Sequence, residues 1–127
     1  MEVKKKVDPI VLTDKETEKK YTLDFCRESV VFAEKQGFNI GKIESGEVLS
    51  TLYDLWFYAF RMHHRFVQRE QADSLLDKLL QGGGKKLSKA VLVRLCELYK
   101  QPYEALDYQD GDEDDGDEGN AQVAVEL

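Results

Sequence analysis

The sequence has 127 residues, of which 42% are apolar and 34% charged, and a formal net charge of −7. This length suits one domain with a single modest core. Two Cys and two His are too few for a disulfide framework or a zinc ribbon. No apolar run approaches the roughly 18 residues of a membrane span, and no apolar signal core follows the charged residues 1–6. We therefore expect neither a membrane protein, nor an exported protein, nor a multidomain enzyme.

The globular part begins with an expected β-hairpin over residues 8–23. Two apolar runs, residues 9–12 and 21–23, flank a polar stretch. Tyr21 and Leu23 share one face of an extended chain. Two strands alone are marginal in water, so the hairpin must pack on helices.

Four helices are predicted after the hairpin, each from apolar residues at helical spacing. Asp24 and Ser45 are the expected caps of the first two, and Gly37 ends the first. The second is apolar on most sides, so we expect it to be central. The predicted fold is α+β and mostly α, with residues 1–107 as one domain in which the hairpin packs on a bundle of about four helices. The predicted helices cover residues 24–36, 45–64, 69–80 and 88–100.

The negative charge is concentrated after this domain. Residues 108–127 hold eight acidic residues and no basic ones, whereas residues 1–107 hold 17 acidic and 18 basic residues. Like charges repel and little apolar surface is available to bury, so we predict a disordered acidic tail over residues 108–127. Its simplest role is solubility, and mimicry or screening of nucleic acid is the functional alternative. Residues 121–127 are mildly apolar and could form a short docking peptide.

Candidate reactive groups do not form a catalytic constellation. His63 and His64 are adjacent, so on a helix they point about 100° apart and cannot hold one metal, although either could be a general base. Cys26 and Cys96 lie in apolar helical patterns and are interpreted as buried free thiols.

Three other motifs point only weakly to a ligand. The Gly-Gly-Gly-Lys-Lys run at 82–86 lacks the strand before it and the Ser or Thr after it that a phosphate loop needs. Asp73 and Asp77 could hold a cation, but their spacing also suits a solvated helix face. Lysine clusters at 4–6 and 19–20 are offset by a nearly neutral body. We expect no enzyme activity, metal, cofactor or nucleic-acid partner.

Several short stretches occur in a recognisable order over residues 8–106. In that order they resemble the tail assembly chaperones of long-tailed bacteriophages, particularly in phages and prophages of Gram-positive bacteria. The stretches are Tyr21-Thr22-Leu23-Asp24-Phe25, Ser29-Val30, Ala33-Glu34, Gly37, Tyr58-Ala59-Phe60-Arg61-Met62-His63, Ala72-Asp73-Ser74-Leu75-Leu76-Asp77, Gly82–Gly84 and Leu95-Cys96-Glu97-Leu98-Tyr99.

The resemblance implies an adaptor rather than an enzyme. Such chaperones are small and mostly helical, and they are thought to keep the tape measure protein soluble until tail tube protein polymerises around it. The implied partners are the tape measure protein and, as a second candidate, the tail tube protein. The implied location is the cytoplasm of the bacterial host rather than the mature virion. Many such chaperones also exist in a longer form made by ribosomal frameshifting, which a protein sequence cannot show.

A groove between the last three predicted helices would seat a helical partner, since the second helix has more apolar surface than a small domain need bury. The residues predicted to contact the partner are Trp56, Phe57, Phe60, Leu95 and Tyr99.

Two other function classes remain open. An antitoxin-like regulator or inhibitor would use the acidic tail as a nucleic-acid mimic, and deleting residues 109–127 is the test that separates it from a chaperone. An enzyme would need a deep pocket that holds one of the histidines and a second titratable group. The oligomeric state is open, because the second helix could support a dimer or a ring.

Overall fold

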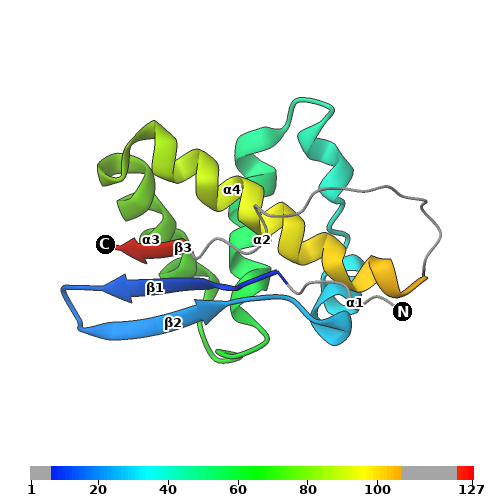
Figure 1. Cartoon of the computed structure of the whole chain (residues 1–127), viewed down its shortest axis with the longest axis horizontal. Coiled ribbons are helices and arrows are strands. Elements are labelled where there is room, and N and C mark those ends of the chain that lie inside the picture. The colour runs from blue at the N-terminus through cyan, green and yellow to red at the C-terminus, as the bar shows by residue number, and fades with distance from the viewer. Residues whose placement is uncertain (1–6, 107–122) are drawn as a thin grey trace.

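The computed structural model describes residues 7–106 and 123–127, and it confirms an α+β fold that is mostly α (Figure 1). Four α-helices and two short 3-10 helices pack on one side of a small sheet. Within the described residues, no helix has both the length and the apolar character needed to cross a bilayer. The elements are β1 (Ile10–Asp14), β2 (Lys19–Leu23), α1 (Arg27–Lys35), η1 (Ile40–Ile43), α2 (Val48–Phe60), α3 (Arg69–Gly82), α4 (Gly84–Lys100), η2 (Gln101–Leu106) and β3 (Val123–Glu126).

The sheet has the strand order β2-β1-β3, so the first strand is in the middle. β1 and β2 form the predicted hairpin, antiparallel, with Ile10 opposite Leu23. β3 lies parallel to β1 on its other side, with Ile10 opposite Val123. The two ends of the described chain therefore meet in one sheet (Figure 1).

One face of this sheet packs against the helices and forms part of the core. Side chains alternate between the two faces of a strand, so every second residue points toward the helices. α4 packs over β1 and β3, whereas α2 contacts β2. The sheet residues of the core are Ile10, Leu12, Tyr21, Leu23 and Val125, none of them more than 6% exposed.

α2 is central, as its nearly all-round apolar pattern predicts. It contacts η1, β2 and the other three α-helices. Leu55, Trp56 and Ala59 on this helix have no exposed surface. The indole Nε1 of Trp56 donates to the carbonyl oxygen of Ala72 at 2.8 Å, which satisfies the one polar atom of this buried ring.

The first two helices begin later than predicted, and Cys26 and Glu47 occupy their N-cap positions. α1 begins at Arg27 instead of residue 24, since Cys26 has extended backbone and its N–H donates to Ser29 Oγ at 2.9 Å. Asp24 accepts from the N–H of Phe25 instead. α2 begins at Val48 behind Glu47, and its last residue is Phe60 because the chain then enters a series of turns.

The glycine run forms a sharper corner than the predicted loop. α3 continues to Gly82 and α4 begins at Gly84, which leaves one residue between them. Gly84 has φ +81°, a conformation that residues with a Cβ rarely adopt. α4 is therefore four residues longer at its start than the predicted helix 88–100.

The prediction of a disordered tail over residues 108–127 is wrong at the end of the chain. Val123–Glu126 form β3, and Val125 is only 1% exposed. Val123 and Leu127 also pack against the core. Pairing with β1 gives these residues a partner for their backbone groups that their own sequence does not supply. The rest of the predicted tail, residues 108–122, and the lysine cluster at 4–6 lie outside the described residues.

Candidate partner-binding site

The predicted partner groove is filled by the protein's own core, so four of its five predicted contact residues are wrong. Trp56, Phe60, Leu95 and Tyr99 are each no more than 1% exposed. The sheet and α1 cover the surface that the sequence seemed to leave open. The ring of Tyr21, for example, lies 5.5 Å from that of Phe60.

Phe57 is half-buried at the seam between α2 and α3. The guanidinium of Arg69 lies 5.4 Å from its ring centroid. The same guanidinium binds Asp54 at 2.9 Å and Asp73 at 3.0 Å. This seam is thus closed by charge pairs within the chain.

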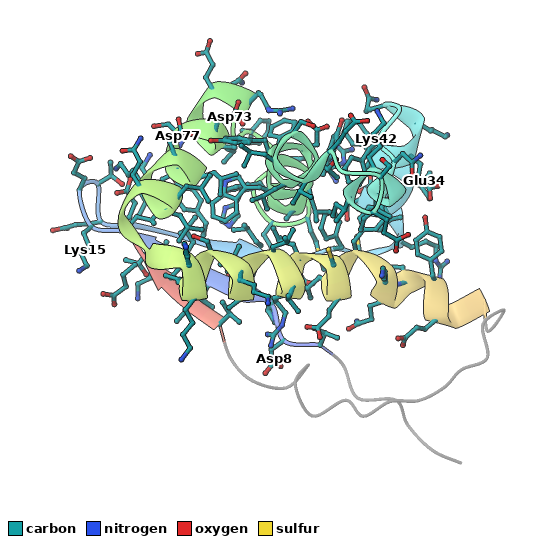
Figure 2. All side chains as sticks on the ribbon, turned by 90° about the horizontal axis from the view of Figure 1, so that it is seen from above. Asp8, Lys15, Glu34, Lys42, Asp73 and Asp77 are labelled. Carbon is teal, nitrogen blue, oxygen red and sulfur yellow. The ribbon has the colours of Figure 1, made fainter. Side chains whose placement is uncertain are left out.

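The two predicted cation ligands have separate partners in this seam. Asp73 pairs with Arg69, and Asp77 accepts the hydroxyl proton of Tyr53. That hydrogen bond, with burial and the charges of Asp77 and Asp73, raises the pKa of Tyr53 to about 12. Figure 2 shows Asp73 and Asp77 together on α3. In the part of the chain that the structure describes, no three acidic, His or Cys side chains are grouped to hold a metal.

The cysteines and His64, which are the candidate reactive groups, take part in packing and backbone contacts. Both cysteines are free and half-buried, and burial raises the pKa of the Cys96 thiol. His64 Nε2 accepts the backbone N–H of Thr22 at 2.9 Å, so that nitrogen is unprotonated. Burial, and then the neighbouring His63, lower the pKa of His64. His64 thereby fastens the loop after α2 to the outer edge of β2.

Apolar surface remains exposed at the two ends of α2. Val48 and Leu49, the Leu49 patch, are 40% and 59% exposed at its start. Met62 and Phe66 lie in the segment between α2 and α3, the Phe66 loop, and are 36% and 90% exposed. α2 has 13 residues, so its two ends lie about 20 Å apart. Sequence reasoning missed Phe66, because Phe66 and Val67 lie between two helical patterns and belong to neither.

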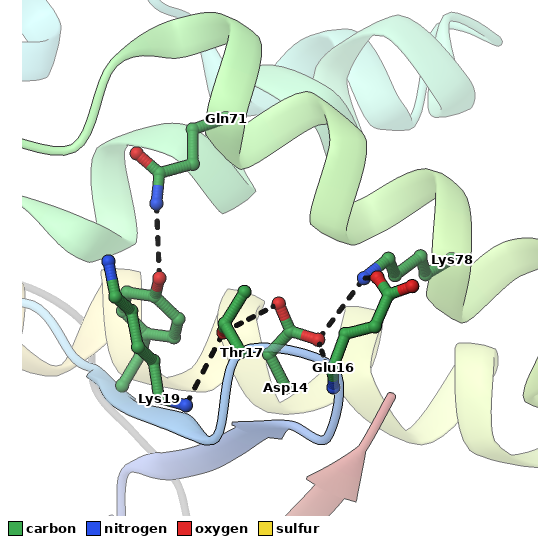
Figure 3. A network of polar contacts seen from close by, with 7 residues as sticks. Asp14, Glu16, Thr17, Lys19, Gln71 and Lys78 are labelled. Atoms are coloured by element: carbon green, nitrogen blue, oxygen red, sulfur yellow. Dashed lines mark hydrogen bonds and ion pairs between the residues drawn. The ribbon is translucent and has the colours of Figure 1, made fainter.

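The β2 side of β1 is held by a polar network at the hairpin turn (Figure 3). Asp14 is only 4% exposed and accepts from Lys78 Nζ and Thr17 Oγ1, both at 3.1 Å, and from the N–H of Glu16. Burial opposes ionisation of Asp14, but these hydrogen bonds outweigh it and lower its pKa. Since Lys78 belongs to α3, the network ties the hairpin to the helices.

Between β1 and β3, the described contacts outside the strand ladder are fewer than at the hairpin turn. The N–H of Leu127 donates to the carbonyl of Thr13 at 2.8 Å, and the N–H of Lys15 donates to the carbonyl of Leu127 at 3.0 Å. Lys15 and Glu126 form an exposed ion pair at 3.4 Å. A short apolar alternation in residues 123–127 is the sequence feature that could have revealed this strand.

Comparison with known families places the whole of this architecture in one domain. The chain matches DUF5055, a domain of unknown function, over residues 3–127. It belongs to the DUF5055 family. The matched range includes residues 107–127, so the acidic segment and β3 are parts of the family's domain. No curated protein and no solved structure matches the chain significantly.

Proposed function

We propose that this protein is a tail assembly chaperone of a long-tailed bacteriophage or prophage. In this proposal it binds the tape measure protein without catalysis and keeps it in solution until tail tube protein polymerises around it. The order of motifs over residues 8–106, which resembles that of tail assembly chaperones, supports this proposal. The observation that carries the proposal is the apolar surface left exposed at the two ends of α2, beside a core that is closed without it.

Phe66 is the strongest single anchor for such a partner. Its ring is 90% exposed, and Arg65, the residue before it, is exposed as well. Aromatic side chains, Phe among them, are enriched in protein interfaces relative to the rest of the surface. A coiled-coil partner presents apolar stripes along its length, and in this proposal Leu49 and Phe66 are two contact points for such stripes. The contact surface thus moves from the predicted groove to the ends of α2.

The test is co-expression with the tape measure protein encoded in the same genome, followed by a pull-down. We expect the long protein to become soluble and to co-purify. Replacing both anchors, by Leu49→Ser and Phe66→Ser, should reduce the co-purified amount by roughly tenfold or more. The control is Val31→Ser with Val93→Ser, since these residues on α1 and α4 are 41% and 44% exposed. A tape measure protein that stays insoluble and unbound contradicts the proposal, and so does an equal loss in the control.

The second candidate is the antitoxin-like regulator or inhibitor with a nucleic-acid mimic. The observation in its favour is that the acidic segment is joined to folded structure at both ends, by η2 and by β3. Deleting residues 109–127 would also remove β3, so the sharper test replaces only the acidic residues of 107–122 by Asn and Gln. A mimic should lose its basic partner in this variant, whereas a chaperone should retain the tape measure protein.

A further inference from the structure

The flank of β1 that faces away from β2 is a binding site for an extended segment, and β3 occupies it. The site consists of the β1 backbone on one side and α4 above it, since α4 packs on both β1 and β3. β3 binds it parallel to β1, with Val123 opposite Ile10 and Val125 opposite Leu12. Val125 is buried in the core, Val123 and Leu127 are half-buried against it, and Ala124 and Glu126 are exposed.

β3 is attached in a way that permits exchange. It is four residues long and pairs with a neighbour along one side only. Val125 is its one fully buried side chain, and its ion pair to Lys15 is exposed. Residues 107–122 lie between it and η2, so β3 can leave β1 without changing the connection of any other described element.

We propose that this flank of β1 binds an extended segment of a partner protein by strand exchange, with β3 as its resident occupant. The partner segment runs parallel to β1 and has apolar side chains at three alternate positions, as Val123, Val125 and Leu127 do. Main-chain hydrogen bonds such as those at Thr13 and Lys15 supply affinity, and the alternate apolar positions supply specificity.

A partner segment is the better occupant than the same strand from a second copy. A second copy offers identical contacts, so it gains no binding free energy over the β3 of the same chain, which binds intramolecularly. It also adds a second set of the eight acidic residues of positions 107–122 to the complex. Like charges repel, so a partner segment without these acidic residues binds at lower cost.

The test uses the full chain with Val125→Asp, which places a charge at the buried position of β3 and leaves β1 and α4 intact. The probe is a labelled synthetic peptide of residues Asn120–Leu127, and binding is followed by fluorescence anisotropy. We expect the peptide to bind this variant at least about tenfold more tightly than the wild-type chain, where β3 competes from a tether. Ala124→Thr, at an exposed position of β3, is the matched control and should behave as the wild type does. A peptide that itself carries Val125→Asp should not bind.

Two results would overturn the proposal: a folded Val125→Asp chain that ignores the peptide at millimolar concentration, or equal binding by variant and wild type. Should the variant fail to fold, hydrogen exchange on the wild-type chain decides instead. Strand exchange requires the amide of Leu127 to exchange faster than the amides that pair β1 with β2. Exchange of all these amides only through global unfolding would contradict it.

Peptide selection then identifies the partner chemistry. A random peptide library screened against the Val125→Asp chain should yield sequences with apolar residues at three alternate positions. Selection of helical, amphipathic sequences instead would contradict strand exchange. None of these experiments uses the tape measure protein, so this inference and the proposed function stand or fall separately.

Discussion

β1 has a neighbour on each side, and the two are held by different means. β2 follows β1 through a short turn. Lys78 of α3 binds Asp14 and Glu16 at that turn, and His64 of the Phe66 loop accepts the N–H of Thr22 in β2. β3 arrives from the far end of the chain and relies on its backbone ladder and one fully buried valine. Two strands of one sheet can therefore differ widely in stability, because side-chain contacts outside the ladder decide how firmly each is held.

Leu23→Ala, a truncation in β2, should cause the largest loss in the free energy of unfolding. Leu23 has no exposed surface and belongs to the main core. Its truncation leaves a cavity, so the free energy of unfolding should fall by about 2–5 kcal/mol in a denaturant titration. Lys20→Ala, at an exposed position of the same strand, is the control and should change it by less than about 0.5 kcal/mol. An equal, small effect of both would mean that β2 is held no more firmly than β3.

Asp14→Asn should be the next largest change, since it removes the charge partner of Lys78 from a nearly buried position. We expect a loss of about 1–3 kcal/mol at neutral pH. The pKa of Asp14 is lowered from 3.8, so its contribution is complete above that value and is lost as the pH falls through the folded pKa. The difference between variant and wild type should therefore shrink in acid. Glu16→Gln, which alters an exposed partner of Lys78, should cost far less, and an equal cost would assign the effect to Lys78 alone.

His64→Ala tests the fastening of β2 to the Phe66 loop. Loss of the hydrogen bond from Thr22 should cost about 1 kcal/mol at pH 8. The pKa of His64 lies below its ordinary 6.5, so the unfolded chain binds more protons and the contribution fades as the pH falls from 6.5 through the folded pKa. Unfolding titrations at several pH values should show the two proteins converging in acid. His63→Ala should show little of this convergence, and an identical profile would contradict the role of His64.

Val125→Ala should have the smallest effect on global stability, below about 0.5 kcal/mol, if β3 opens before the rest of the fold. The same change should nevertheless accelerate hydrogen exchange at the amide of Leu127, because it removes apolar contact from β3 alone. A loss of more than about 2 kcal/mol would show that β3 unfolds together with the core. In that case the two sides of β1 would be equivalent, contrary to the difference drawn above.

The helices were predictable where one residue pattern dominated. The repeat of Ala72, Leu75, Leu76 and Leu79 located α3, and all four are buried. The cap positions were not predictable in the same way, because Asp24 and Ser45 are good caps in isolation and the packed chain uses Cys26 and Glu47. Capping preferences are worth about 1 kcal/mol, so the position of a helix in the core overrides them.

The candidate contact surface was predicted less well than the fold. Trp56 and Phe60 were selected because a small domain was not expected to bury every ring of a helix that is apolar nearly all round, and the sheet and α1 supplied the missing cover. Phe66 was overlooked because exposure depends on what packs nearby, and no periodic pattern reports that for a connecting residue.

The sequence by itself determined the hairpin, the four helices, the central place of α2 and the separation of an acidic segment from a nearly neutral body. These features depend on the local spacing of apolar residues and on the distribution of charge, and both can be read from one sequence. Only the tertiary structure decided that Val123–Glu126 is a strand, that His64 fastens β2, and that the aromatic stripe of α2 is core. Each of these depends on a partner far away in the sequence, and the free energy of such a contact exists only once the chain has folded.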